Sequence, residues 1–153
     1  VLFRSVTELS RPNGIAFSRD GKRLYVTNTA ENPDKPEENA PESVTDAEGR
    51  HHIWVFDLDT DNNVKKGSGR PFACPALGVP DGIAVDEADR VWSSGGDGVS
   101  VFGSDGSLIA HAPVPEVVSN LCFGGEDGQD LFITATTSLY RLRTNTREPW
   151  SFA

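Results

Sequence analysis

Apolar and polar residues alternate along this chain in short runs, and turn-forming residues separate one run from the next. In residues 51–59, for example, Ile53 and Val55 would point to one face of a strand and Trp54 and Phe56 to the other. No window keeps a helical spacing of apolar residues, because Gly or Pro interrupts nearly every stretch of about a dozen residues. The pattern therefore predicts an all-β protein.

One short phrase opens three successive units of the chain. It reads PNGIAF from residue 12, PDGIAV from residue 80 and SNLCFG from residue 119. Each copy continues with a turn containing Gly or Asp, a second strand, and a third strand predicted over 51–59, 98–106 or 138–146. The second and third copies start 39 residues apart. A period near 40 residues with several short strands indicates the blades of a β-propeller.

The number of repeats bears on how much of a propeller this chain contains. A propeller needs about four to eight blades to close, and three units are recognisable. A further strand over VLFRSVTEL, at 1–9, would finish a preceding blade. The length of 153 residues suits one domain with a hydrophobic core. We therefore expect residues 1–153 to form a partial β-propeller, about half of a complete one.

The segment 31–49 differs from the rest of the chain in composition. It holds seven acidic residues against one Lys, together with three Pro and no aromatic residue. Such a composition is typical of a flexible, solvated loop, because it cannot bury enough apolar surface to become ordered. Since successive strands alternate in direction, this acidic insert and the three repeated phrases should share one face of the propeller.

The overall composition argues against two classes of partner. The net charge of −9 disfavours nucleic acid, because phosphate binding requires clustered Lys and Arg. No apolar run approaches the roughly 18 residues of a membrane helix, so no membrane partner is expected. Cys74 and Cys122 lack metal-ligand spacing, and two buried or idle thiols are expected, with a disulfide as the less favoured alternative. No signal peptide is recognisable, and a cytoplasmic location is the expectation.

Three polar residues occupy the same place in the three repeats. Asn13, Asp81 and Asn120 each stand at the head of the innermost strand of a predicted blade. Inner strands line the central axis of a propeller, so these side chains would converge there. Converging oxygen donors suit a hard divalent cation such as Ca²⁺, Mg²⁺ or Mn²⁺. The alternative is that Asn and Asp cap turns by bonding to nearby backbone amides. Spacing leaves both interpretations open.

The stretches RPNGIAFSRDGKRLYVTNT, PDGIAVDEADRVWSSGGDGVSVFGSDGSLIAHAPVP and SNLCFGGEDGQDLFITATTSLYRLR resemble the C-terminal half of the gluconolactonase and regucalcin (senescence marker protein) family. The resemblance covers nearly all of residues 11–146 apart from the acidic insert. It implies a six-bladed propeller with one divalent metal ion (Ca²⁺, Zn²⁺, Mg²⁺ or Mn²⁺) in its central channel. It also implies that Asn13 is a metal ligand and that Asp81 is both a metal ligand and the catalytic acid/base. It implies no ligand role for Asn120.

The function implied by this resemblance is metal-dependent hydrolysis of a sugar lactone by the intact parent protein. Asp81 would take the proton of the attacking water. The family draws a further metal-binding Glu from its first blade and substrate-contacting Arg and Asn residues from a middle blade. The resemblance therefore implies that the missing N-terminal half of the propeller is a necessary partner. Two alternatives remain: a hydrolase of another ester or phosphotriester, and a non-catalytic propeller that serves as a binding surface.

Overall fold

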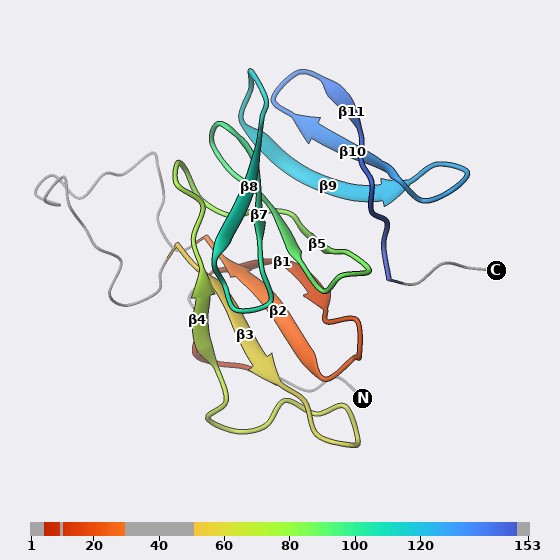
Figure 1. The fold of residues 1–153 in the computed structure, drawn as a ribbon. Coiled ribbons are helices and arrows are strands. Elements are labelled where there is room, and N and C mark those ends of the chain that lie inside the picture. The colour runs from red at the N-terminus through yellow and green to blue at the C-terminus, as the bar shows by residue number, and fades with distance from the viewer. Residues whose placement is uncertain (1–4, 10, 30–50, 150–153) are drawn as a thin grey trace, which may run out of the picture.

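The structure of this chain is a computed structural model that describes residues 5–9, 11–29 and 51–149. These residues form eleven strands in three antiparallel sheets, and no helix occurs among them (Figure 1). The first sheet has the order β1-β2-β3-β4. Its strands are β1 (Pro12–Phe17), β2 (Arg23–Asn28), β3 (Ile53–Asp57) and β4 (Arg70–Ala73).

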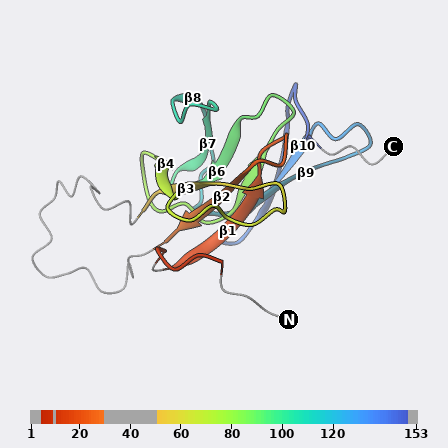
Figure 2. The same cartoon turned by 90° about the horizontal axis from the view of Figure 1, so that it is seen from below.

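The second and third sheets repeat the same up-and-down arrangement. The second has the order β5-β6-β7-β8, with β5 (Ile83–Val85), β6 (Val91–Ser94), β7 (Gly98–Phe102) and β8 (Leu108–Pro113). The third has the order β11-β10-β9, with β9 (Val118–Gly124), β10 (Asp130–Ala135) and β11 (Leu139–Arg143). Figure 2 shows the same sheets from below. Each predicted repeat thus corresponds to one sheet.

The hairpin turns follow from the local sequence. Asp20-Gly21 joins β1 to β2, and Asp105-Gly106 joins β7 to β8. Both glycines adopt positive φ angles, 67° and 85°, which a residue with a Cβ rarely takes. These Asp-Gly pairs therefore form the turns of both hairpins.

Two hydrophobic cores lie between the three sheets. Strands β6 and β7 of the second sheet are buried along their whole length, so this sheet packs on both of its faces. The first core joins it to the first sheet and contains Tyr25, Ile53, Val55, Ala73, Ile83, Val85, Val91 and Phe102. The second core joins it to the third sheet and contains Trp92, Val99, Val101, Val118, Leu121, Phe123, Leu131 and Ile133. Sheets that pack face to face in succession are the blades of a propeller, which confirms the predicted fold class.

Two strands were not predicted, and the described part of one predicted strand is not a strand. β4 and β8 are fourth strands at the outer edges of their sheets, where each pairs with one neighbour only. β4 contains Pro71, which an edge strand tolerates because it needs hydrogen bonds on one side only. Residues 5–9 form no strand, contrary to the prediction for VLFRSVTEL. Residues 1–4 and the acidic insert at 31–49 lie outside the described residues.

Two further observations concern membrane-spanning helices and the cysteines. The part of the chain that the structure describes contains no helix long and apolar enough to span a bilayer. Cys74 and Cys122 form no disulfide with each other, and Cys122 is exposed.

Candidate metal site

The heads of the three inner strands lie side by side. The backbone N–H of Gly14, before the body of β1, donates to the carbonyl oxygen of Asp81 at 3.1 Å. The N–H of Gly82, just before β5, donates to the carbonyl oxygen of Ser119 in β9 at 2.9 Å. Hydrogen bonds thus connect the head of each inner strand to the head of the next. The structure brings together the three phrases that the sequence repeats.

Glycine follows the polar residue in the first two phrases because the strand heads approach too closely for a side chain. A Cβ on Gly14 would lie 2.2 Å from the carbonyl oxygen of Asp81. A Cβ on Gly82 would lie 2.1 Å from Oδ1 of Asn120. Both distances are far inside van der Waals contact, so only glycine allows this packing.

The Pro-Asn-Gly phrase forms an irregular start to β1. Pro12 pairs with Asn28, but the register between β1 and β2 shifts before Ile15 pairs with Val26. Asn13 therefore lies in a bulge and outside the regular ladder of the hairpin. Bulges redirect side chains and are common next to functional sites, and the side chain of Asn13 is exposed.

Asp81 is held by its backbone, while its carboxylate makes no hydrogen bond within the described part of the chain. Its N–H donates to Oγ of Ser94 at 2.9 Å, and its carbonyl oxygen accepts from Oγ1 of Thr27 at 2.8 Å. No hydrogen bond joins its carboxylate to any other described residue. Partial burial raises the pKa of the Asp81 carboxyl, and the positive charge of Arg11 partly offsets this effect. A carboxylate without a protein partner in a partly buried place is suited to receive a cation.

Asn120 differs from the other two polar residues. Its Oδ1 accepts a hydrogen bond from the backbone N–H of Leu121 at 2.8 Å and packs against Gly82. This is a local side-chain bond to the next backbone N–H, made inside β9, where Asn120 pairs with Thr134 and lies in no turn. The side chain of Asn13, by contrast, makes no hydrogen bond with any described residue. The free oxygen donors at the strand heads are therefore those of Asn13 and Asp81.

These two residues fit a divalent cation but do not complete its coordination. An amide oxygen and a carboxylate are ligands that hard cations prefer, and Ca²⁺ takes about six to eight oxygen ligands. Within the described ranges, no three His, Cys, Asp or Glu residues gather closely enough to hold a metal ion. A complete site would therefore need donors from water and from outside the described residues.

Two residues behind the site were missed from the sequence. Thr27 in β2 and Ser94 in β6 are both fully buried, with 0% of their surface exposed, and both bond to the backbone of Asp81. One signal was available: polar runs, Thr27-Asn28-Thr29 and Ser93-Ser94, end strands that are otherwise apolar and buried. Buried hydroxyl groups need partners, and here the partner is the strand head.

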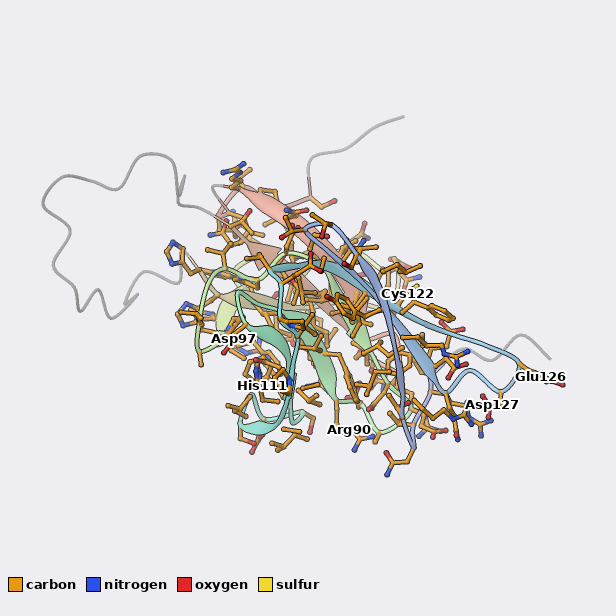
Figure 3. The ribbon with its side chains drawn as sticks, turned by 90° about the horizontal axis from the view of Figure 1, so that it is seen from above. Arg90, Asp97, His111, Cys122, Glu126 and Asp127 are labelled. Carbon is orange, nitrogen blue, oxygen red and sulfur yellow. The ribbon has the colours of Figure 1, made fainter. Side chains whose placement is uncertain are left out.

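His111 lies away from this site. It is on β8, the outermost strand of the second blade, and faces Asp97 of the β6–β7 connection, with Nε2 3.6 Å from Oδ2 (Figure 3). The inner strands β1, β5 and β9 carry the candidate ligands instead. The structure therefore gives this histidine no part in the candidate metal site.

Comparison with known proteins agrees with the geometry. The sequence model of the family described as SMP-30/Gluconolactonase/LRE-like region matches residues 43–137. The gluconolactonase of Zymomonas mobilis is 35% identical over 147 residues, which are 90% of this chain and 36% of that protein. The pentonolactonase XacC of Haloferax volcanii is 30% identical over 132 residues, which are 84% of this chain and 39% of that protein. The solved gluconolactonase of Xanthomonas campestris superposes with a TM-score of 0.67 at 38% identity, covering 88% of this chain and 38% of that one.

The fold and the linked strand heads define three blades of a β-propeller with a polar site at the heads of its inner strands. The chain belongs to the SMP-30/gluconolactonase/LRE-like family, as the resemblance implied. It spans little more than a third of the length of the curated relatives named above, 36% and 39%.

Proposed function

We propose that the complete protein is a metal-dependent hydrolase of a sugar lactone. Family membership supports this proposal, and so do the relatives that are named gluconolactonase and pentonolactonase. The observation on this chain that carries it is the carboxylate of Asp81. It is partly buried, has no hydrogen-bond partner among the described residues, and stands beside the head of the strand that holds Asn13.

In this proposal Asn13 and Asp81 hold one divalent cation, with Ca²⁺, Zn²⁺, Mg²⁺ and Mn²⁺ as the candidates. The cation, when bound, supplies Lewis-acid polarisation of the lactone carbonyl. Asp81 places one carboxylate oxygen toward the cation and uses the other to accept a proton from the attacking water. Its backbone is fixed on both sides, by Ser94 and Thr27, so the point from which the carboxylate projects is held in place. The remaining blades of the complete protein supply the other ligands and the substrate contacts.

The test compares two substitutions in the complete protein with gluconolactone as substrate. Asp81→Asn keeps the shape and one oxygen but removes the charge and the basicity. We expect turnover to fall by a factor on the order of 10² or more with the metal saturating, as for loss of a general base. Metal affinity should fall only modestly. Asn13→Ala should act through the metal, so that high metal concentration partly restores turnover.

Asp61→Asn is the matched control, because Asp61 is an exposed carboxylate in the turn after β3. It should hydrolyse gluconolactone like the unmodified protein. Near-normal hydrolysis by Asp81→Asn at saturating metal would show that Asp81 is not the base. Hydrolysis of phosphotriesters or other esters in preference to lactones would favour the related hydrolase, and hydrolysis of none of these would favour a binding propeller.

A further inference from the structure

The hydroxyl group of Thr27 joins two strand heads that belong to different blades. Thr27 lies in β2 of the first blade and is fully buried, with 0% exposed surface. Its Oγ1 accepts a hydrogen bond from the N–H of Gly14 at 2.6 Å and donates one to the carbonyl oxygen of Asp81 at 2.8 Å. The direct bond between Gly14 N and Asp81 O is longer, at 3.1 Å.

One of these backbone groups directly follows Asn13, and the other belongs to Asp81. The N–H of Gly14 is part of the peptide bond that follows Asn13, so holding it holds the peptide plane next to Asn13. The carbonyl group that Thr27 bonds is that of Asp81 itself. One hydroxyl group therefore bridges the peptide bond after Asn13 and the carbonyl group of Asp81, alongside the longer direct bond between them. On the other side of Asp81, the buried hydroxyl of Ser94 holds the N–H.

We propose that Thr27 is a positioning residue, whose hydroxyl sets the spacing of Asn13 and Asp81 and thereby the metal affinity of the site. This inference rests on the proposed metal site, and it holds whatever substrate the protein hydrolyses. Ligands of a metal must be held within roughly 0.5 Å of the productive geometry. Groups that orient metal ligands from behind typically change metal affinity by about 10- to 100-fold when they are removed.

A merely structural role for Thr27 makes a different prediction. If the hydroxyl only satisfied buried polar groups, its loss would lower thermal stability and leave the metal affinity of the folded protein unchanged. The geometry favours the positioning role, because without the hydroxyl Gly14 N and Asp81 O would each keep a partner, but only through the longer direct bond between them. Neither backbone group would lose its last partner, so the protein should remain folded.

The experiment compares three variants of the complete protein. Thr27→Val keeps the shape and removes the hydroxyl, whereas Thr27→Ser keeps the hydroxyl. Thr146→Val is the matched control: Thr146 is also buried, 1% exposed, and its Oγ1 has no hydrogen-bond partner among the described residues. Each protein is titrated calorimetrically with Ca²⁺, and in separate runs with Zn²⁺, Mg²⁺ and Mn²⁺. Thermal unfolding without metal shows whether each variant is folded.

We expect Thr27→Val to bind the preferred metal at least about tenfold more weakly. Thr27→Ser and Thr146→Val should bind it nearly as the unmodified protein does. Equal affinity of Thr27→Val and the unmodified protein would overturn the inference. So would a Thr27→Val variant that fails to fold while Thr146→Val folds, since the hydroxyl would then serve stability.

The outcomes also separate this inference from the proposed function. If the unmodified protein binds metal in a Thr27-dependent way but hydrolyses no lactone, the positioning role stands and the lactonase proposal fails. If the unmodified protein binds none of the four metals, the metal site is wrong, and the inference is overturned with it.

Discussion

At the scale of the residue, equivalent places in the three repeats have different chemical environments. The oxygen of Asn120 is engaged by the N–H of Leu121, whereas the carboxylate of Asp81 has no such bond. The three residues look alike in sequence because each stands at the head of an inner strand. Only the packing distinguishes Asn120, whose oxygen is engaged, from the candidate ligand Asp81: Gly82 lies against Asn120, and partial burial raises the pKa of Asp81.

A second residue-scale feature is the hydroxyl group of Tyr25, which is buried in the first core without a hydrogen-bond partner among the described residues. Burial raises the pKa of this phenol to about 12, so it stays neutral. An unsatisfied buried hydroxyl is unfavourable. We therefore predict that Tyr25→Phe leaves the free energy of unfolding unchanged or raises it by up to about 1 kcal/mol, as measured by urea denaturation.

Tyr140→Phe is the control for this prediction, because the Tyr140 hydroxyl donates to Oε1 of Glu116 at 2.6 Å. Its loss should lower the free energy of unfolding. A Tyr25→Phe variant that is less stable than Tyr140→Phe would show that the Tyr25 hydroxyl has a partner after all, such as a buried water molecule.

At the scale of the element, the carboxylate of Glu116 joins the β8–β9 connection to the turn between β10 and β11. Glu116 lies between β8 and β9 and accepts hydrogen bonds from the turn between β10 and β11. The donors are Thr137 N–H at 2.7 Å, Thr137 Oγ1 at 2.9 Å and Ser138 Oγ at 2.5 Å, and Tyr140 of β11 adds the fourth. These bonds, first the one from Ser138 and then the one from Tyr140, lower the pKa of Glu116 to about 2.

This lowered pKa predicts how stability depends on pH. The ordinary value for the carboxyl group is 4.5, so below that pH the unfolded chain binds a proton that the folded chain does not. The stabilisation from Glu116 is therefore complete above pH 4.5 and is lost as the pH falls toward about 2. Glu116→Gln removes the titrating group. Denaturant unfolding at pH 6 and pH 3 should show a smaller loss of stability for Glu116→Gln than for the unmodified protein.

Asp127→Asn is a second test of the pH prediction, since the side-chain bond from Arg143 lowers the pKa of Asp127 to about 2 as well. This variant should also flatten the acid dependence, and the two effects should add because the groups share no partner. An unchanged pH dependence in Glu116→Gln would mean that the Glu116 bonds contribute nothing to stability in solution.

The elements also show where prediction from sequence succeeds. The inner and middle strands, such as β3, show a clear alternation of side chains and lie between turns that contain glycine. All of these strands were predicted. β8 was missed because its sequence, LIAHAP, is almost wholly apolar and shows no alternation of apolar and polar residues, although most of the strand is exposed. The roles of Thr27 and Ser94 could not be predicted from the sequence, because the residue type does not reveal which group its hydroxyl will bond. The partner of Thr27 lies 54 residues away, in another blade.

At the scale of the whole molecule, the two outer sheets each leave one face without a neighbour among the described residues. In β1, Ala16 packs against the first core, so Ile15 and Phe17 point away from it and are 61% and 48% exposed. In β11, Tyr140 packs against the second core, and Leu139 points away with 69% exposed. The middle sheet is covered on both faces. In a closed propeller every blade is covered in this way.

These open faces predict the behaviour of the 153-residue chain expressed alone. Exposed apolar faces and unpaired strand edges promote association, so the chain should elute as oligomers or aggregates when light scattering is measured during gel filtration. Phe17→Asp and Leu139→Asp place a charge on each open face and should shift the chain toward the monomer. Leu108→Asp is the control, because Leu108 is similarly exposed, 54%, but lies on the outer edge strand β8. A monodisperse monomer with one cooperative thermal transition would contradict this account, since it would show that three blades close on their own.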